Sequence, residues 1–366
     1  MMICILVTRE GSHTIDEYLR AWGSMIAQRV NVVLYESLAL RRSIPDADTY
    51  IFTDVERMHP AMRHGAFQLY RMLKSHSRRP RILNHPLRTH GRYRLLRMLQ
   101  SQGINRFQVR RATEPLDSLR YPVFLRLEHD HAGNRTKLLD YPEQLHQAIE
   151  ALCFKGWRRN EMLVTEFCNT ADSDGIYRKY AAFVVGCQII PRHMLFGEHW
   201  MLKADTALAG VSSTCAADHE RFLKEQLEYI HGNPHADTLR KICMAAHVTY
   251  GRIDYSLLDG TIQIWEINTN PTILKPPEKY SPCEKATHET FADRIATTLA
   301  SLGDEPRETA IRFAPPWRAR AAITRARMAR YMERRRRRIY RWWTQGRTLP
   351  SNRADIDSDL LVGKCK

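Results

Sequence analysis

The sequence predicts an α/β fold with more than one domain. The chain has 366 residues, enough for two or three domains of ordinary size. Its first hundred residues alternate short apolar runs with amphipathic stretches, and later runs rich in β-branched and aromatic residues are joined by short turn signals. Strands alternating with helices are typical of a parallel sheet, whereas runs joined by short turns indicate hairpins.

Residues 1–112 are predicted to form a small N-terminal α/β domain. Its expected strands are short apolar runs, at residues 3–7, 30–35, 49–53 and 81–86. Its expected helices have helical periodicity, at residues 14–28, 61–74 and 91–102. Gly103 follows the last of these at the position of a helix stop.

Residues 113–302 are predicted to form a second domain. Strands are expected within residues 121–134 and 161–170, and a hairpin turning at Gly186 is expected over 176–196. Helices are expected at residues 218–230, 236–248 and 287–302.

A second hairpin, GRIDYSLLDGTIQIWEINTNP, carries a set of polar side chains. Asp259-Gly260 is a strong turn signal, and alternation along the following strand puts Glu266, Asn268 and Asn270 on one face. Asp254 joins that face only if the connecting loop is odd, as in a three-residue loop with Gly260 left-handed. A two-residue turn would place Asp254 and Glu266 on opposite faces.

With the odd loop, two carboxylates and an amide oxygen converge. Such donors repel one another unless a cation lies between them, and oxygen donors suit Mg²⁺ or Mn²⁺. Magnesium held by few carboxylates completes its shell with water and substrate phosphates, which indicates a nucleotide-phosphate site. A polar strand face open to water is the alternative.

The pattern Arg252-x-Asp254, a hairpin, Glu266-x-Asn268 and then Asn270-Pro271 resembles the metal-binding end of the ATP-grasp superfamily, which includes D-alanine:D-alanine ligase and glutathione synthetase. The resemblance covers roughly residues 1–300 and implies an ATP-grasp fold behind an N-terminal parallel-sheet domain. It implies that Asp254, Glu266 and Asn268 hold the Mg²⁺ ions bridging the ATP phosphates. It also implies that Arg252 acts as a catalytic residue against the reacting phosphoryl group.

The same resemblance implies nucleotide contacts earlier in the chain. Arg126 stands where family members have a phosphate-binding lysine, and the glycine-rich flap keeps only Gly133. Glu166 and Phe167 match the adenine-binding strand and hinge, and Lys203 is a further candidate nucleotide contact. Basic residues at strand ends suit carboxylates and phosphates, although ordinary solvated strand ends have them too. The expected substrate contacts are Arg178, Lys179, Arg192, His193 and Asn270.

The implied activity is that of an ADP-forming ligase. A small-molecule or peptide carboxylate would be activated by ATP as an acyl phosphate, and an amine or thiol would then displace phosphate. Two alternatives are a kinase-like phosphotransferase and a non-catalytic scaffold that works through its basic tail.

The tail, residues 303–366, has a different composition and is predicted to be an Arg-rich helical segment. Residues 317–347 hold twelve arginines and one acid, which accounts for +11 of the net charge of +16. Aromatic residues are interleaved with the arginines. Possible partners of such a helix are nucleic acid, an anionic membrane surface or an acidic protein.

Composition also bears on the compartment. The eight cysteines include no CxxC pair, which indicates neither a zinc ribbon nor a disulfide framework. The apolar run at the N-terminus is too short for a signal peptide, and no run has the length of a membrane span. A cytoplasmic protein is expected, and an oligomer is compatible with the sequence.

Overall fold

The computed structural model describes most of the chain outside the C-terminal tail. The described residues are 2–38, 41, 43–130, 133–202, 216–280, 282–302 and 310–312, with six further positions between 325 and 335. They divide into two compact units. Unit 1 takes its described residues from 1–90, 170–260 and 264–326, and unit 2 from 91–169, 261–263 and 327–366. The limits of these units differ from the predicted domain boundaries, which lie after residues 112 and 302. Those boundaries stay a prediction.

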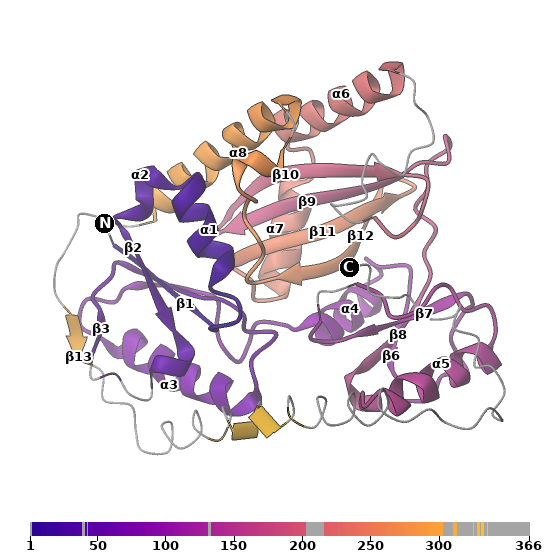
Figure 1. The fold of residues 1–366 in the computed structure, drawn as a ribbon, viewed down its shortest axis with the longest axis horizontal. Helices are drawn as coiled ribbons and strands as arrows, with labels where there is room; N and C mark the ends of the chain where they lie inside the picture. The colour runs from indigo at the N-terminus through magenta and orange to yellow at the C-terminus, as the bar shows by residue number, and fades with distance from the viewer. Residues whose placement is uncertain are drawn as a thin grey trace. The chain divides into compact units, whose positions relative to one another are not determined.

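Unit 1 begins with the predicted parallel sheet (Figure 1). Its strands lie in the order β2-β1-β4-β5 and are all parallel. They are β1 (Ile3–Val7), β2 (Val30–Leu34), β4 (Thr49–Phe52) and β5 (Arg81–Leu83). Helix α3 (Pro60–Ser75) packs its buried face on this sheet, and a short strand β3 (Ser43–Pro45) pairs with β13 (Ala310–Arg312).

The single helix predicted over residues 14–28 is wrong. The chain instead forms α1 (His13–Ala21) and α2 (Ser24–Ala27). The amides of Trp22 and Gly23 both donate to the carbonyl of Tyr18, which closes α1. A Cβ at Gly23 would lie 2.9 Å from the Tyr18 ring and 3.1 Å from the Leu19 Cα, so the close turn needs glycine there.

An antiparallel sheet forms the other half of unit 1, in the order β10-β9-β11-β12. Its strands are β9 (Tyr177–Val185), β10 (Gln188–Gly197), β11 (Tyr250–Leu258) and β12 (Thr261–Asn268). The accompanying helices are α6 (Ala216–Gly232), α7 (Ala236–Ala245) and α8 (Pro282–Ala300). One buried cluster joins residues of both sheets with α1, α2 and α8, so unit 1 has a shared core.

Asn84 links the two sheets of unit 1. Its side-chain nitrogen donates to the carbonyls of Phe52 and Tyr250, each at 2.9 Å, and its oxygen accepts from the amides of Thr249 and Tyr250. The residue is 3% exposed and has a φ of 59°. One amide side chain therefore satisfies four backbone groups at this junction.

We expect Asn84→Ala to lower the free energy of unfolding by about 3 kcal/mol, because buried backbone groups lose their partners at roughly 1–3 kcal/mol each. Urea denaturation would measure the loss. Asn233→Ala is the matched control: Asn233 also has a positive φ (45°), but its side chain bonds one backbone group, the carbonyl of Ile189. Equal losses in the two variants would contradict the assigned role of Asn84.

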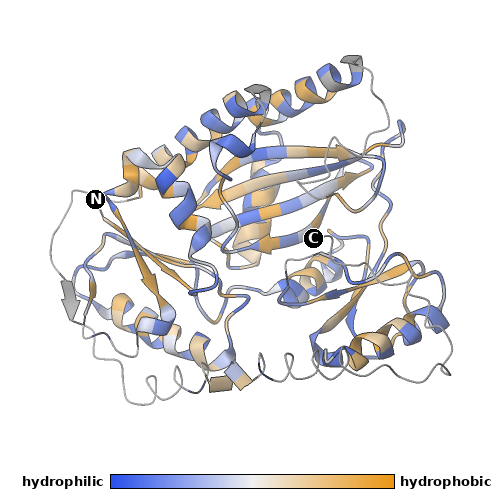
Figure 2. Cartoon of the chain, viewed as in Figure 1, coloured by the Kyte–Doolittle hydropathy of each residue, from blue (hydrophilic) through white to orange (hydrophobic). Residues whose placement is uncertain are grey.

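Unit 2 is built on an antiparallel sheet in the order β6-β8-β7. Its strands are β6 (Val109–Arg111), β8 (Met162–Glu166) and β7 (Val123–Leu127), and its helices are α4 (Arg92–Ser101) and α5 (Pro142–Phe154). The apolar side of α5 packs on β7 and β8 in one buried cluster. Figure 2 shows hydrophobic and hydrophilic sides on α5.

The α/β fold class is confirmed: a parallel sheet comes first, and antiparallel sheets follow. The segment 317–347 lies outside the described residues apart from six positions, where the chain is helical. Among the described residues, no helix has both the length and the apolar character needed to cross a membrane. Cys4, Cys153, Cys187 and Cys243 are free thiols.

Candidate functional site

The hairpin that carries the metal motif turns through two residues. Strand β11 ends at Leu258 and β12 begins at Thr261, with Asp259 at φ 49° and Gly260 at φ 72°. Two left-handed residues form the turn that best matches the twist of a hairpin. Of the two loops that the sequence left open, the structure has the two-residue turn and not the three-residue loop on which the convergence of Asp254 and Glu266 depended.

Asp254 lies buried in β11 between two cations. The Nε of Arg252 is 2.7 Å from its Oδ1, and the Nζ of Lys179 is 2.9 Å from its Oδ2. Burial raises the pKa of Asp254, but Arg252 and Lys179 outweigh it, so the pKa lies below its ordinary value. The pKa of Arg252 is raised, because Asp254 and Glu266 outweigh its own burial. Asp254 is therefore a carboxylate in a cation-rich environment.

Glu266 lies within electrostatic reach of Asp254, since its charge raises the Asp254 pKa. Strict alternation from a two-residue turn would place Trp265, not Glu266, on the Asp254 face. The indole nitrogen of Trp265 donates to the hydroxyl of Ser256 at 2.9 Å, and Ser256 is on the Asp254 face by the same alternation. The convergence of Glu266 with Asp254 on one metal thus stays a prediction.

Asn268 and Asn270 hold the chain that leaves β12. The side-chain oxygen of Asn268 accepts from the amide of Asn270 at 2.8 Å and from Arg57 at 3.4 Å. The side chain of Asn270 accepts from the Thr14 hydroxyl at 2.8 Å and donates to the carbonyl of Gly11 at 3.0 Å. The Asn270 side chain is thus occupied in a structural role within unit 1, and its predicted substrate contact stays a prediction.

A buried polar network that sequence reasoning missed lies beside this chain. Asp54 accepts from both the amide and the hydroxyl of Thr8, and Glu56 accepts from the amide of Thr269 at 3.1 Å and from its hydroxyl. Burial raises the pKa of Asp54, although Arg57 opposes it. Thr8 follows the carboxyl end of β1, and Asp54 and Glu56 follow that of β4. This is the edge of a parallel sheet where ligands commonly bind. The run TDVER directly after β4 was the signal available in the sequence.

The other predicted substrate residues separate into two groups. Arg178 is already paired with two acids, because its guanidinium lies 2.8 Å from both Asp174 and Glu225. His193 and Asp254 stand opposite the same residue, Ala181, in neighbouring strand pairs, so they share a face of the sheet. The structure thus brings Arg252, Lys179, Asp254 and His193 together and commits Arg178 to other partners.

The predicted nucleotide residues of unit 2 lie on its sheet. Arg126 in β7 stands opposite Leu163 of β8, and Phe167 directly follows β8. Glu166 ends β8 and is 1% exposed. Its carboxylate accepts from the amides of Gln108 at 2.9 Å and Arg120 at 2.8 Å, and from the Arg120 guanidinium. An adenine contact by this carboxylate would have to replace one of these bonds.

We expect Glu166→Ala to loosen unit 2 itself. Two backbone amides would lose a buried acceptor, at a cost of about 1–2 kcal/mol, while the Arg120 ion pair adds little because that guanidinium is largely exposed. Faster hydrogen exchange at Gln108 and Arg120 would reveal the loss. Glu150→Ala, which removes an exposed ion pair with Arg159 in the same unit, is the control. If hydrogen exchange at Gln108 and Arg120 is unchanged in Glu166→Ala, the Glu166 carboxylate does not stabilise unit 2.

Lys203 lies outside the described residues.

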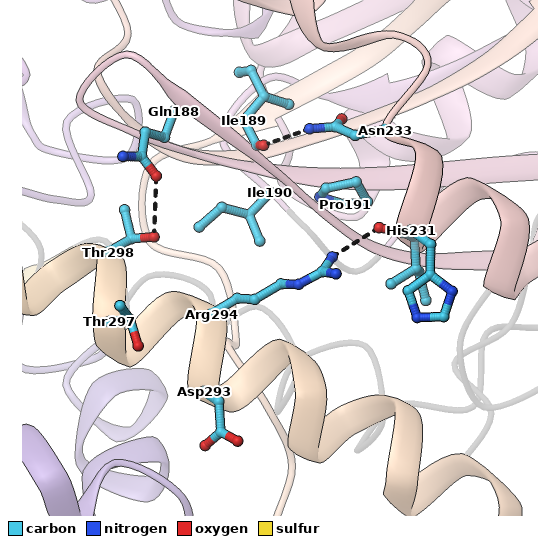
Figure 3. A pocket seen from close by; sticks show the side chains of 11 residues that line it. Gln188, Ile189, Ile190, Pro191, His231, Asn233, Asp293, Arg294, Thr297 and Thr298 are labelled. Carbon is cyan, nitrogen blue, oxygen red and sulfur yellow. Dashed lines mark hydrogen bonds between the residues drawn. The ribbon is translucent and has the colours of Figure 1, made fainter.

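A pocket of about 440 Å³ in unit 1 lies between β10, the end of α6 and α8 (Figure 3). Several of its polar side chains are bonded within the unit: Asn233 to Ile189, Gln188 to Thr298, and Arg294 to the carbonyl of Ile230 at 2.8 Å. None of the predicted site residues lines this pocket.

No protein-family model matches the chain, and no curated protein matches its sequence. Solved structures do match. D-alanine–D-alanine ligase from Bacillus anthracis, in a complex with ATP, is 14% identical, with 84% of this chain and 100% of that one covered and a TM-score of 0.46. A RimK domain ATP-grasp protein from Sphaerobacter thermophilus is 13% identical, with coverages of 81% and 99% and a TM-score of 0.47.

Carboxyaminoimidazole ribonucleotide synthase from Aspergillus clavatus, complexed with ATP, is 13% identical, with coverages of 73% and 69% and a TM-score of 0.43. All three similarities are remote, and none bears on the substrate of this chain. One of these similar structures is an ATP-grasp protein.

Proposed function

We propose that this protein is an ATP-dependent, Mg²⁺-dependent ligase that activates a substrate carboxylate as an acyl phosphate for attack by an amine or thiol. The observation that carries the proposal is the buried Asp254 carboxylate, flanked by Arg252 and Lys179 and within reach of Glu266. Acids that attract a metal beside cations that attract phosphate form the charge pattern that phosphoryl transfer needs.

The donor set fits Mg²⁺ or Mn²⁺, because Asp254, Glu266 and Asn268 supply only oxygen. Each carboxylate oxygen of Asp254 is paired with a cationic side chain, so a metal ion would have to replace either Arg252 or Lys179. Lys179, whose side chain is 25% exposed on a flexible stem, is the partner that can turn away. Bound metal would neutralise phosphate charge and so favour attack by an anionic acid.

The chain's own residues would do the rest. Arg252, held at Asp254, would stabilise the phosphoryl group during its transfer, and Lys179 would pair with phosphate or the acid once released from Asp254. Arg126, Glu166 and Phe167 in unit 2 and Lys203 are proposed as nucleotide contacts. Arg178, Lys179, Arg192, His193 and Asn270 are proposed as substrate contacts. The partner molecules are thus ATP and a carboxylate-bearing substrate.

The test is release of ADP and phosphate from Mg-ATP by purified protein against pooled carboxylic acids and amines or thiols. Turnover that needs both an acid and a nucleophile supports the ligase. ADP formed while phosphate stays on an acceptor hydroxyl would identify a phosphotransferase instead. Absence of Mg²⁺-dependent binding of a non-hydrolysable ATP analogue would remove the proposal.

A further inference from the structure

Arg192 occupies a β-bulge in the antiparallel sheet of unit 1. Pro191 stands opposite Ala182 and His193 stands opposite Ala181, so Arg192 is an extra residue without a partner in the ladder. A bulge bends its strand and changes the direction of a side chain, and bulges are frequent beside active sites. Here the bulge directs a charged side chain inward: Arg192 is 5% exposed.

The buried guanidinium of Arg192 has neutral partners. Its Nε donates to the carbonyl of Ile273 at 3.2 Å, one terminal nitrogen donates to Nδ1 of His288 at 3.0 Å, and the other lies 3.4 Å from the hydroxyl of Tyr280. The ring of Phe291 lies 4.8 Å from its central carbon. Within the described part of the chain, no carboxylate forms an ion pair with Arg192.

Burial outweighs the groups that favour the charged form of Arg192, which are Tyr280 and Glu284. Burial and the nearby Arg252 lower the pKa of Arg192 to about 10. Burial and Arg192 together lower the pKa of His288 to about 3, so this imidazole is neutral. Burying an ion without a counter-ion costs several kcal/mol. A methionine of similar size would fill the same space without that cost.

Arg192 has more N–H groups than its three neutral partners use. A guanidinium has five N–H groups, and three serve Ile273, His288 and Tyr280. The other two are one on each terminal nitrogen, and a guanidinium can bind both oxygens of a carboxylate through two of its nitrogens. Burial lowers the pKa of His193, and the charges of Arg192 and Arg252 lower it further. His193 therefore lies near both arginines, which places Arg192 close to the sheet face that carries Asp254.

We propose that Arg192 binds a carboxylate of the substrate that is not the reacting one. The substrate acid is then a small dicarboxylate, or an amino acid with a second carboxylate: one group reacts at the Asp254 face, and the other pairs with Arg192. This inference rests on the proposed ligase function for the reacting group, but the binding of the second carboxylate can be tested without ATP.

The experiment compares dicarboxylates from malonate to adipate with the monocarboxylates acetate and butyrate, at equal ionic strength and without nucleotide. The measurement is the unfolding temperature of the full-length protein, followed by calorimetry. We expect at least one dicarboxylate to raise the unfolding temperature by about 3 °C at ten times its Kd, and monocarboxylates to have no such effect. Arg192→Met should lose the response, and Arg192→Lys should retain part of it.

The matched control is Arg294→Met. Arg294 also donates to a backbone carbonyl within unit 1, but it lines the separate pocket of Figure 3, so its loss should leave the dicarboxylate response intact. Without ligand, Arg192→Met should unfold at the wild-type temperature or above it. A lower unfolding temperature together with an unchanged dicarboxylate response would show that Arg192 only anchors Ile273, and would overturn the proposal. The absence of any dicarboxylate response in the wild type would overturn it as well.

The two proposals fail separately. If the dicarboxylate response is present but no acid supports ATP turnover, the anion site stands and the ligase chemistry fails. If Mg-ATP analogue binds and dicarboxylates do not, the ligase proposal stands and the assignment of Arg192 fails.

Discussion

Asp254→Asn is expected to abolish Mg²⁺-dependent nucleotide binding and to lower the free energy of unfolding by about 2–4 kcal/mol. The neutral amide leaves Arg252 and Lys179 facing each other in a buried site without their counter-charge. It also removes the charge of the proposed metal ligand. Calorimetry with Mg²⁺ and a non-hydrolysable ATP analogue measures the first effect, and urea denaturation measures the second.

Asp174→Asn is the matched control for this variant. Asp174 also contacts two arginines, Arg178 and Arg221, and its pKa is lowered to about 2, first by its bond to Arg178. It lies nearer the surface, so its loss should cost less than about 1 kcal/mol and leave nucleotide binding unchanged. If the two variants bind the nucleotide equally well, Asp254 is not a metal ligand.

Asp254→Asn should also change how the stability depends on pH. The folded-state pKa of Asp254 is lowered, so its stabilising contribution is present above the unfolded value of about 3.9 and is lost as the pH falls through the folded value. The stability of the wild type should therefore fall more steeply below about pH 4 than that of Asp254→Asn. If the free energy of unfolding falls equally steeply at low pH in both proteins, Arg252 and Lys179 do not lower the pKa of the Asp254 carboxylate.

Gly251→Ala is expected to have the second largest effect, a loss of about 3 kcal/mol in the free energy of unfolding together with weakened metal binding. A Cβ at this position would lie 2.6 Å from the carbonyl oxygen of Asn268 and 3.3 Å from the Cα of Thr269. Backbone atoms cannot move aside like the end of a side chain. The strand that carries Asn268 would be displaced from β11.

Gly232→Ala provides the control, because the nearest atom to a Cβ there is 4.0 Å away, at Pro234. That variant should be neutral in both measurements, urea denaturation and calorimetry with Mg²⁺. If Gly251→Ala keeps wild-type stability, the close approach of β11 and β12 tolerates a methyl group, and Asn268 does not depend on it.

Local pattern was enough to predict the fold class and most elements. The parallel sheet, the hairpin at Gly186 and the hairpin at Asp259-Gly260 follow from apolar periodicity and from turn residues whose preferences act over a few positions. The pattern of Arg252, Asp254, Glu266 and Asn268 resembles the ATP-grasp motif. The pairing of Arg252 with Asp254 is itself local, because side chains two apart on a strand share a face.

What only the tertiary structure decided depends on contacts between distant parts of the chain. The Arg192 bulge results from the register of two strands, and the Glu166 carboxylate is bonded by residues 46 and 58 positions away in sequence. Asn84 and Thr269 join elements more than 160 positions apart. Sequence patterns report which residues can lie on a strand or helix. Which buried donor meets which acceptor is set by how the elements pack, because every buried polar group must find its partner there.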